Sequence, residues 1–204
     1  MMQYLVLKNP VVFEEEIKKS RFITYLRRVN GLAEARAFWQ EMRETYPTAR
    51  HHCWATVAGR PQDSGQYGFS DDGEPTGTAG KPMINALIGS GIGEISVVSV
   101  RYFGGVLLGT GGLVRAYGNG VQQALKLAQT EIKIERSDYQ LVCSYEQLNR
   151  ILAILPQYQV ELYHQDFTEV VRLTLGIIEQ QRPSFELTLQ NMSAGQLTLT
   201  KIEP

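Results

Sequence analysis

The sequence predicts an α+β protein built from two domains, residues 1–134 and 135–204, and three observations lead to this prediction. Runs of β-branched residues alternate with stretches in which apolar residues recur at helical spacing. Of the 19 glycines, 16 lie between Gly59 and Gly120. The first 136 residues hold 16 Lys and Arg against 13 Asp and Glu, whereas the remaining 68 hold 4 against 8. We therefore expect a basic, glycine-rich domain followed by an acidic one.

The first domain begins with strands. We expect these strands at residues 4–7, 13–17, 21–29, 51–57 and 94–103. The last of them is a continuous β-branched run, which is typical of a buried strand. Between the third and fourth strands, Leu32, Phe38 and Met42 lie on one helical stripe, and this predicts a helix that Pro47 ends.

Two more helices are expected in the glycine-rich part. One begins near Pro82, with Thr78 or Gly80 as its cap. The other begins at Thr110, which we expect to cap it, and carries an apolar stripe to Leu125. Two glycines inside this second helix each cost about 1 kcal/mol relative to alanine. Their presence indicates close packing of the helix against a neighbour or another need for small residues.

The second domain has a simpler order of elements. We expect strands at residues 139–145, 158–164, 169–175 and 196–202, and helices at 146–155 and 183–192. Proline suits the first turn of the last helix. The resulting order, βαββαβ, is that of the ferredoxin-like split βαβ unit. We therefore predict helices packed on an antiparallel sheet.

Composition limits the class of protein. The chain has 204 residues, of which 43% are hydrophobic and 20% charged, as in ordinary globular proteins. No apolar run approaches the roughly 18 residues of a membrane span, and we see no secretory signal. Cys53 and Cys143 have no metal-type spacing. We expect a reduced, cytoplasmic protein without membrane contact.

The loop at residues 68–82 concentrates glycine, carboxylates and a lysine. A helix N-terminus favours an anion, so Lys81 and the backbone before it are candidates for phosphate binding. Asp71, Asp72 and Glu74 either bind a metal through oxygen or merely solvate the loop. Their spacing matches no calcium loop, so solvation is the favoured interpretation and we expect no metal.

A second segment, residues 101–117, reads as a buried strand, a glycine-rich turn and a helix, which is an arrangement that cradles phosphates. It lacks the lysine and Ser/Thr pair of a P-loop and the glycine order of a dinucleotide site. The glycines alone also fit close packing of the helix. Arg101 and Arg115 flank the turn, and arginine is the preferred planar partner of phosphate.

A third segment is Arg50-His51-His52-Cys53. Adjacent residues of a strand point to opposite faces, so the two histidines do not suit one metal. Cys53 shares a face with His51, and we expect it to be buried and inert rather than a nucleophile. The candidate anion-binding residues of the three segments are Arg50, His51, His52, Lys81, Arg101, Tyr102, Thr110, Gly111, Gly112 and Arg115.

Taken together, four stretches resemble the IMPACT family and specifically its bacterial YigZ-like branch. They are residues 18–22, 49–53, 69–82 and 101–117, and the run from Gly91 to Gly109 is similar to the family's signature. The resemblance implies that the first domain has the fold of ribosomal protein S5 domain 2. It also implies that the second is ferredoxin-like, similar to elongation factor G domain V. At the level of function it implies a link to translation and to RNA or the ribosome.

We consider three functions. The first is a non-enzymatic regulator that binds RNA or the ribosome through Lys81, Arg101, Arg115 and Arg50, with Tyr102 or Phe103 stacking on a base. The second is an enzyme acting on a phosphorylated small molecule or nucleotide in the same cleft, with a histidine transferring protons. The third is a scaffold without ligand. We prefer the first, without a cofactor, and expect the acidic second domain to contact protein.

Overall fold

The computed structural model describes residues 3–203, which form two units that we treat separately. The first extends from Tyr4 to Lys133, and the second contains the chain from Ile134 onward. None of the helices in residues 3–203 is both long enough and apolar enough to cross a membrane.

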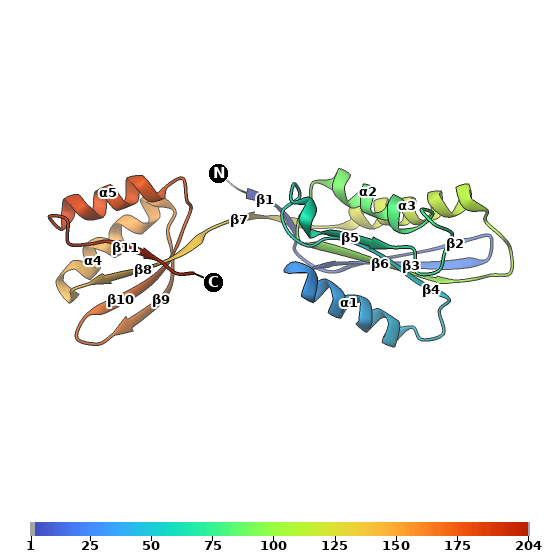
Figure 1. Ribbon diagram of the computed structural model, residues 1–204, viewed down its shortest axis with the longest axis horizontal. Coiled ribbons are helices and arrows are strands. Elements are labelled where there is room, and N and C mark those ends of the chain that lie inside the picture. The colour runs from blue at the N-terminus through green and yellow to red at the C-terminus, as the bar shows by residue number, and fades with distance from the viewer. Residues whose placement is uncertain (1–2, 204) are drawn as a thin grey trace. The chain divides into compact units, whose positions relative to one another are not determined.

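The first unit is built on a five-stranded antiparallel sheet (Figure 1). Its strand order is β2 (Val11–Ile17), β3 (Ser20–Arg28), β6 (Ile95–Tyr102), β4 (His51–Val57) and β5 (Tyr67–Ser70). The central strand β6 is buried over all but its last residue, as its β-branched sequence predicts.

Helices cover both faces of this sheet (Figure 1). α2 (Gly80–Ser90) and α3 (Thr110–Leu127) pack on one face, where Met83, Leu87 and Tyr117 join the main hydrophobic core. α1 (Gly31–Thr45) packs on the other face through Phe38 and Met42. The helix predicted at residues 32–46 is therefore confirmed.

A small separate sheet pairs β1 (Gln3–Leu7) with β7 (Thr130–Ile134). The sequence predicts no strand at β7, because we expected a domain boundary there. β5 was also not predicted, since its four residues include a glycine and follow a short 3₁₀ turn (Ser64–Gln66). β7 depends on pairing with β1, which is far away in the sequence, whereas β5 pairs with the nearby strand β4.

The second unit has the predicted βαββαβ order. Its antiparallel sheet has the order β11 (Leu199–Lys201), β8 (Ser137–Cys143), β10 (Val171–Ile177) and β9 (Glu161–Phe167). The helices are α4 (Tyr145–Ile154) and α5 (Arg182–Met192). β9 starts three residues later than predicted, because Leu155–Tyr158 form a 3₁₀ turn.

Helix caps differ from the predicted ones in the first unit. Ala79 is the N-cap residue of α2, and neither Thr78 nor Gly80 caps it. The N-cap residue of α3 is Gly109 at φ +75°, so Thr110 is the first helical residue and not the cap. Within residues 3–203, no side chain accepts a hydrogen bond from the N–H groups of Thr110, Gly111 or Gly112. The N–H groups of the first turn of α3 have no acceptor within the helix and are therefore left without a side-chain partner.

Candidate functional site

A cavity of about 420 Å³ lies where β4 begins, β6 ends and α3 begins. The strand register places the start of β4 beside the end of β6, because His51 is paired with Arg101 across the sheet. The cavity is lined by Arg50, His51, Glu74, Pro75, Arg101, Phe103, Leu107, Leu108, Gly109, Thr110 and Leu113. The three segments singled out in the sequence thus converge on one hollow.

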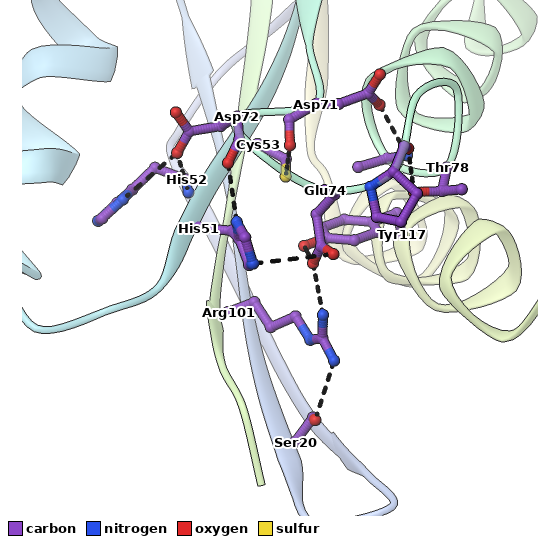
Figure 2. Close-up of polar contacts among 12 residues, drawn as sticks. Ser20, His51, His52, Cys53, Asp71, Asp72, Glu74, Thr78, Arg101 and Tyr117 are labelled. Atoms are coloured by element: carbon purple, nitrogen blue, oxygen red, sulfur yellow. Dashed lines mark hydrogen bonds and ion pairs between the residues drawn. The ribbon is translucent and has the colours of Figure 1, made fainter. Parts of the chain in front are cut away.

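A buried ion pair forms the floor of the cavity (Figure 2). Arg101 Nη1 lies 2.7 Å from Glu74 Oε1, and the two side chains are 6% and 3% exposed. The Tyr117 hydroxyl donates to the same Glu74 oxygen at 2.7 Å, and Arg101 Nη2 donates to Ser20 Oγ at 3.4 Å. Within the described part of the chain, the buried Arg101 Nε–H has no acceptor. This N–H is shielded from solvent, so the guanidinium has one hydrogen bond that the protein leaves unmade.

His51 faces the cavity in a defined tautomer. Its Nδ1 lies 2.8 Å from the carbonyl oxygen of Asp72, and a carbonyl only accepts hydrogen bonds, so Nδ1 carries the proton (Figure 2). The other nitrogen, Nε2, lies 3.9 Å from Glu74 Oε2, too far for a hydrogen bond. In neutral His51, the Nε2 lone pair is therefore available to a ligand.

The carboxylates of Asp71 and Asp72 are occupied by the protein itself. Asp71 Oδ1 accepts from the N–H groups of Ala79 and Gly80 at 3.0 and 2.8 Å, and Oδ2 accepts from Gly77 at 2.8 Å. Burial alone would raise the pKa of Asp71, but these three N–H groups outweigh burial and lower it. The α2 N-terminus thus already holds an anion.

Asp72 fixes the same loop to β4. Its Oδ2 accepts from the backbone N–H of His52 at 2.6 Å, and its Oδ1 pairs with Arg43. No cluster of three or more metal-ligating side chains occurs among residues 3–203. These carboxylates therefore organise the loop that carries Glu74.

Cys53 lies on the same face of β4 as His51, as strand alternation predicts. It is fully buried, and its thiol donates to the Asp71 carbonyl oxygen at 3.0 Å. Burial raises the pKa of the thiol far above its ordinary value. The thiol therefore stays protonated and is a poor nucleophile.

The remaining candidate residues lie outside the cavity. His52 is on the opposite face of β4, where Nε2 lies 3.0 Å from the Tyr46 carbonyl oxygen, and Tyr102 packs against the α1 core. Lys81 lies over the Phe69 ring at 5.8 Å. Gly111 is exposed beside the cavity. Two residues, Gly112 and Arg115, line a second, adjoining groove.

Sequence reasoning named Phe103 as a stacking residue but missed the rest of the apolar wall of the cavity, which consists of Pro75, Leu107, Leu108 and Leu113. A signal was present, since residues 106–108 read Val-Leu-Leu between two glycine-containing turns. Leu107 is 80% exposed.

Two family models of known proteins match this chain, one in each of its two units. The family model of the Impact N-terminal domain matches residues 18–125, and that of a domain of unknown function, DUF1949, matches residues 141–196. An IMPACT family member of Haemophilus influenzae is 59% identical over 203 residues, covering 100% of this chain and 98% of that protein. The IMPACT family member YigZ of Escherichia coli is 50% identical, with 100% of both chains covered. A crystal structure of a hypothetical protein is 50% identical with a TM-score of 0.75, covering 100% of this chain and 98% of the other.

Proposed function

The chain belongs to the IMPACT family, and from this premise we propose that it is a translation-linked regulator that binds RNA, free or in the ribosome. One observation carries the RNA part of the proposal. The cavity combines two arginines, Arg50 and Arg101, with the uncapped N-terminus of an 18-residue helix. Arginine donors and free N–H groups are the groups that bind phosphate oxygens.

Charge and exposure support the same ligand. In residues 3–203, the exposed Arg50 has no carboxylate within 4.0 Å, so its charge is available. Phe103 is 40% exposed, and its ring lies 5.6 Å from the Arg101 guanidinium. An exposed aromatic side chain beside a phosphate site suits stacking of an unpaired base. Because Glu74 compensates Arg101, the expected footprint is a few phosphates and not a duplex.

The proposal extends to the specific fold of each domain. The order β11-β8-β10-β9 corresponds to strands four, one, three and two of βαββαβ, which supports a ferredoxin-like second domain. The S5 domain 2-like fold of the first domain rests on the family. The division between Lys133 and Ile134 supports domains at 1–134 and 135–204. A protein partner for the acidic second domain and a cytoplasmic location belong to the same proposal.

The direct test is binding of fluorescently labelled single-stranded RNA, followed by anisotropy at 50 and 200 mM salt. Arg50→Ala removes an exposed cavity cation, and we expect several-fold weaker binding and a flatter salt dependence. Lys81→Ala is the matched control, because it removes an exposed cation outside the cavity. Undetectable binding at 50 mM salt, or equal loss in both variants, would contradict the proposal.

A second candidate function is an enzyme acting on a phosphorylated small molecule or nucleotide. The observation that favours it is the fixed tautomer of His51, whose Nε2 faces the cavity and is able to accept a proton. A screen of phosphate esters for phosphate release tests it. Release that His51→Asn abolishes, without loss of tryptophan fluorescence, would favour the enzyme over the RNA-binding regulator.

A further inference from the structure

A second hollow of about 620 Å³ adjoins the cavity, and the two share Leu108. We call it the α3 groove. It lies between the turn that joins β2 to β3 and the first turns of α3. It is lined by Ile17, Lys18, Leu108, Gly112, Val114, Arg115, Ala116, Gly118, Asn119 and Gln122.

The turn beside the α3 groove has an unusual sequence for its geometry. Ile17 pairs with Ser20, so Lys18 and Lys19 form a two-residue hairpin loop. Both lysines have positive φ, at 47° and 63°, in a turn type for which Asn and Gly are favoured. Non-glycine residues held in this region are strained, and such strain clusters at functional positions. Two cations are thus held at a site where the backbone disfavours lysine.

This turn is fixed to the floor of the cavity. Ser20 Oγ accepts from Arg101 Nη2 at 3.4 Å and from the backbone N–H of Gly104 at 3.3 Å. A Cβ atom at Gly104 would lie 1.9 Å from the carbonyl oxygen of Lys19. The turn and the strand end that carries Arg101 therefore keep a fixed spacing.

The charge of the α3 groove is available to a ligand. In the part of the chain that the structure describes, neither Lys18 nor Arg115 has a carboxylate within 4.0 Å. Glu15 is the nearby acid, and its Oε1 lies 3.6 Å from where a Cβ of Gly120 would be. Burial raises the pKa of Glu15, and a hydrogen bond from Asn119 offsets part of the rise.

We propose that the α3 groove binds a further phosphate of a single strand of RNA whose neighbouring phosphate occupies the cavity. This inference rests on the proposed RNA binding and adds the path of the strand, which passes Leu108 and crosses the first turns of α3. Lys18 and Arg115 neutralise the phosphate. The amide of Gln122 offers both a donor and an acceptor, as the 2′-hydroxyl and base edges require, whereas the Asn119 amide is engaged by Gln123 and Glu15.

The test compares uridylate oligonucleotides of two and eight nucleotides in anisotropy competition. The variant is the pair Lys18→Asn and Arg115→Gln, because Asn suits the left-handed turn and Gln suits a helix. We expect at least a tenfold loss of affinity for the octamer and little change for the dinucleotide. The slope of log K against log salt should fall by about 0.7, because the groove contacts one phosphate of the strand.

The matched control is the pair Lys81→Ala and Arg36→Ala, which removes the same charge from exposed positions outside both hollows. Equal weakening by the control pair would show non-specific attraction and overturn the inference. Unchanged octamer binding in the groove variant would overturn it as well, while an effect of Arg50→Ala would leave the cavity proposal standing. Absence of RNA binding by the unmodified chain would remove the proposed function itself.

Discussion

Arg101 and Glu74 form a 2.7 Å ion pair between side chains that are both more than nine-tenths buried. Removing one partner of such a pair leaves an uncompensated charge, at a cost of about 3–5 kcal/mol. We therefore expect Arg101→Met to lower the free energy of unfolding by this amount. Urea denaturation followed by tryptophan fluorescence measures it, since Trp39 and Trp54 both lie in the first unit.

The double variant Arg101→Met with Glu74→Gln is the control for this prediction. It removes both charges, so most of the lost stability should return. A single Arg101→Met variant as stable as the unmodified chain would contradict a structural role for the pair.

Asp71 should stabilise the loop in a pH-dependent way. Its carboxylate acts as the cap of α2, so Asp71→Ala should lower the free energy of unfolding by roughly 2 kcal/mol at pH 7. Because the folded-state pKa of Asp71 lies below its ordinary 3.8, its contribution is present above that value and is lost as pH falls through the lower folded pKa. Urea midpoints from pH 7 to pH 2 measure the difference, which should narrow below about pH 4. A constant difference across this range would contradict the role of the charge.

Gly104 and Gly111 should respond differently to alanine. A Cβ at Gly104 would overlap the Lys19 backbone, whereas a Cβ at Gly111 meets nothing within 4 Å. We expect Gly104→Ala to destabilise the first unit strongly and Gly111→Ala to leave it unchanged or more stable by up to about 1 kcal/mol. Thermal unfolding of the two variants, followed by tryptophan fluorescence, tests this. Equal melting temperatures would argue against the close approach at Gly104.

Cys53 should resist alkylation in the folded protein. Burial raises its thiol pKa, so the reactive thiolate is scarce, and the side chain has no exposed surface. Iodoacetamide at pH 8 followed by peptide mass spectrometry should modify Cys53 rapidly only after denaturation in urea. Rapid modification of the native chain would identify a reactive thiol and revive the nucleophile interpretation.

Much of the fold follows from patterns along the chain. The apolar stripe of α1 and the β-branched run of β6 are local signals, and both elements were predicted. β7 was missed because it is held by pairing with β1, far away in the sequence, and β5 was missed because its four residues include a glycine and follow a 3₁₀ turn. The start of α2 was misjudged for a similar reason, since its cap comes from Asp71, eight residues before Ala79.

The candidate site was predicted in part. Residue types and turn chemistry pointed to Arg50, His51, Arg101 and Thr110, which the structure brings together. Sequence alone did not reveal that Glu74 neutralises Arg101 or that Asp71 already fills the α2 N-terminus. Those contacts depend on how the loop folds back on the sheet, which no spacing encodes.

The hydrophobic clusters of the two units have consequences for denaturation. Leu87, Tyr117 and their neighbours all come from the first unit, whereas Leu141, Phe185 and theirs all come from the second. Each unit therefore has its own hydrophobic core, which is disrupted when that unit unfolds on heating. A calorimetric scan should resolve two heat-absorption peaks, and a single two-state transition would not describe the whole chain. Both tryptophans lie in the first unit. Tryptophan emission should therefore change during the unfolding transition of the first unit and stay constant during that of the second.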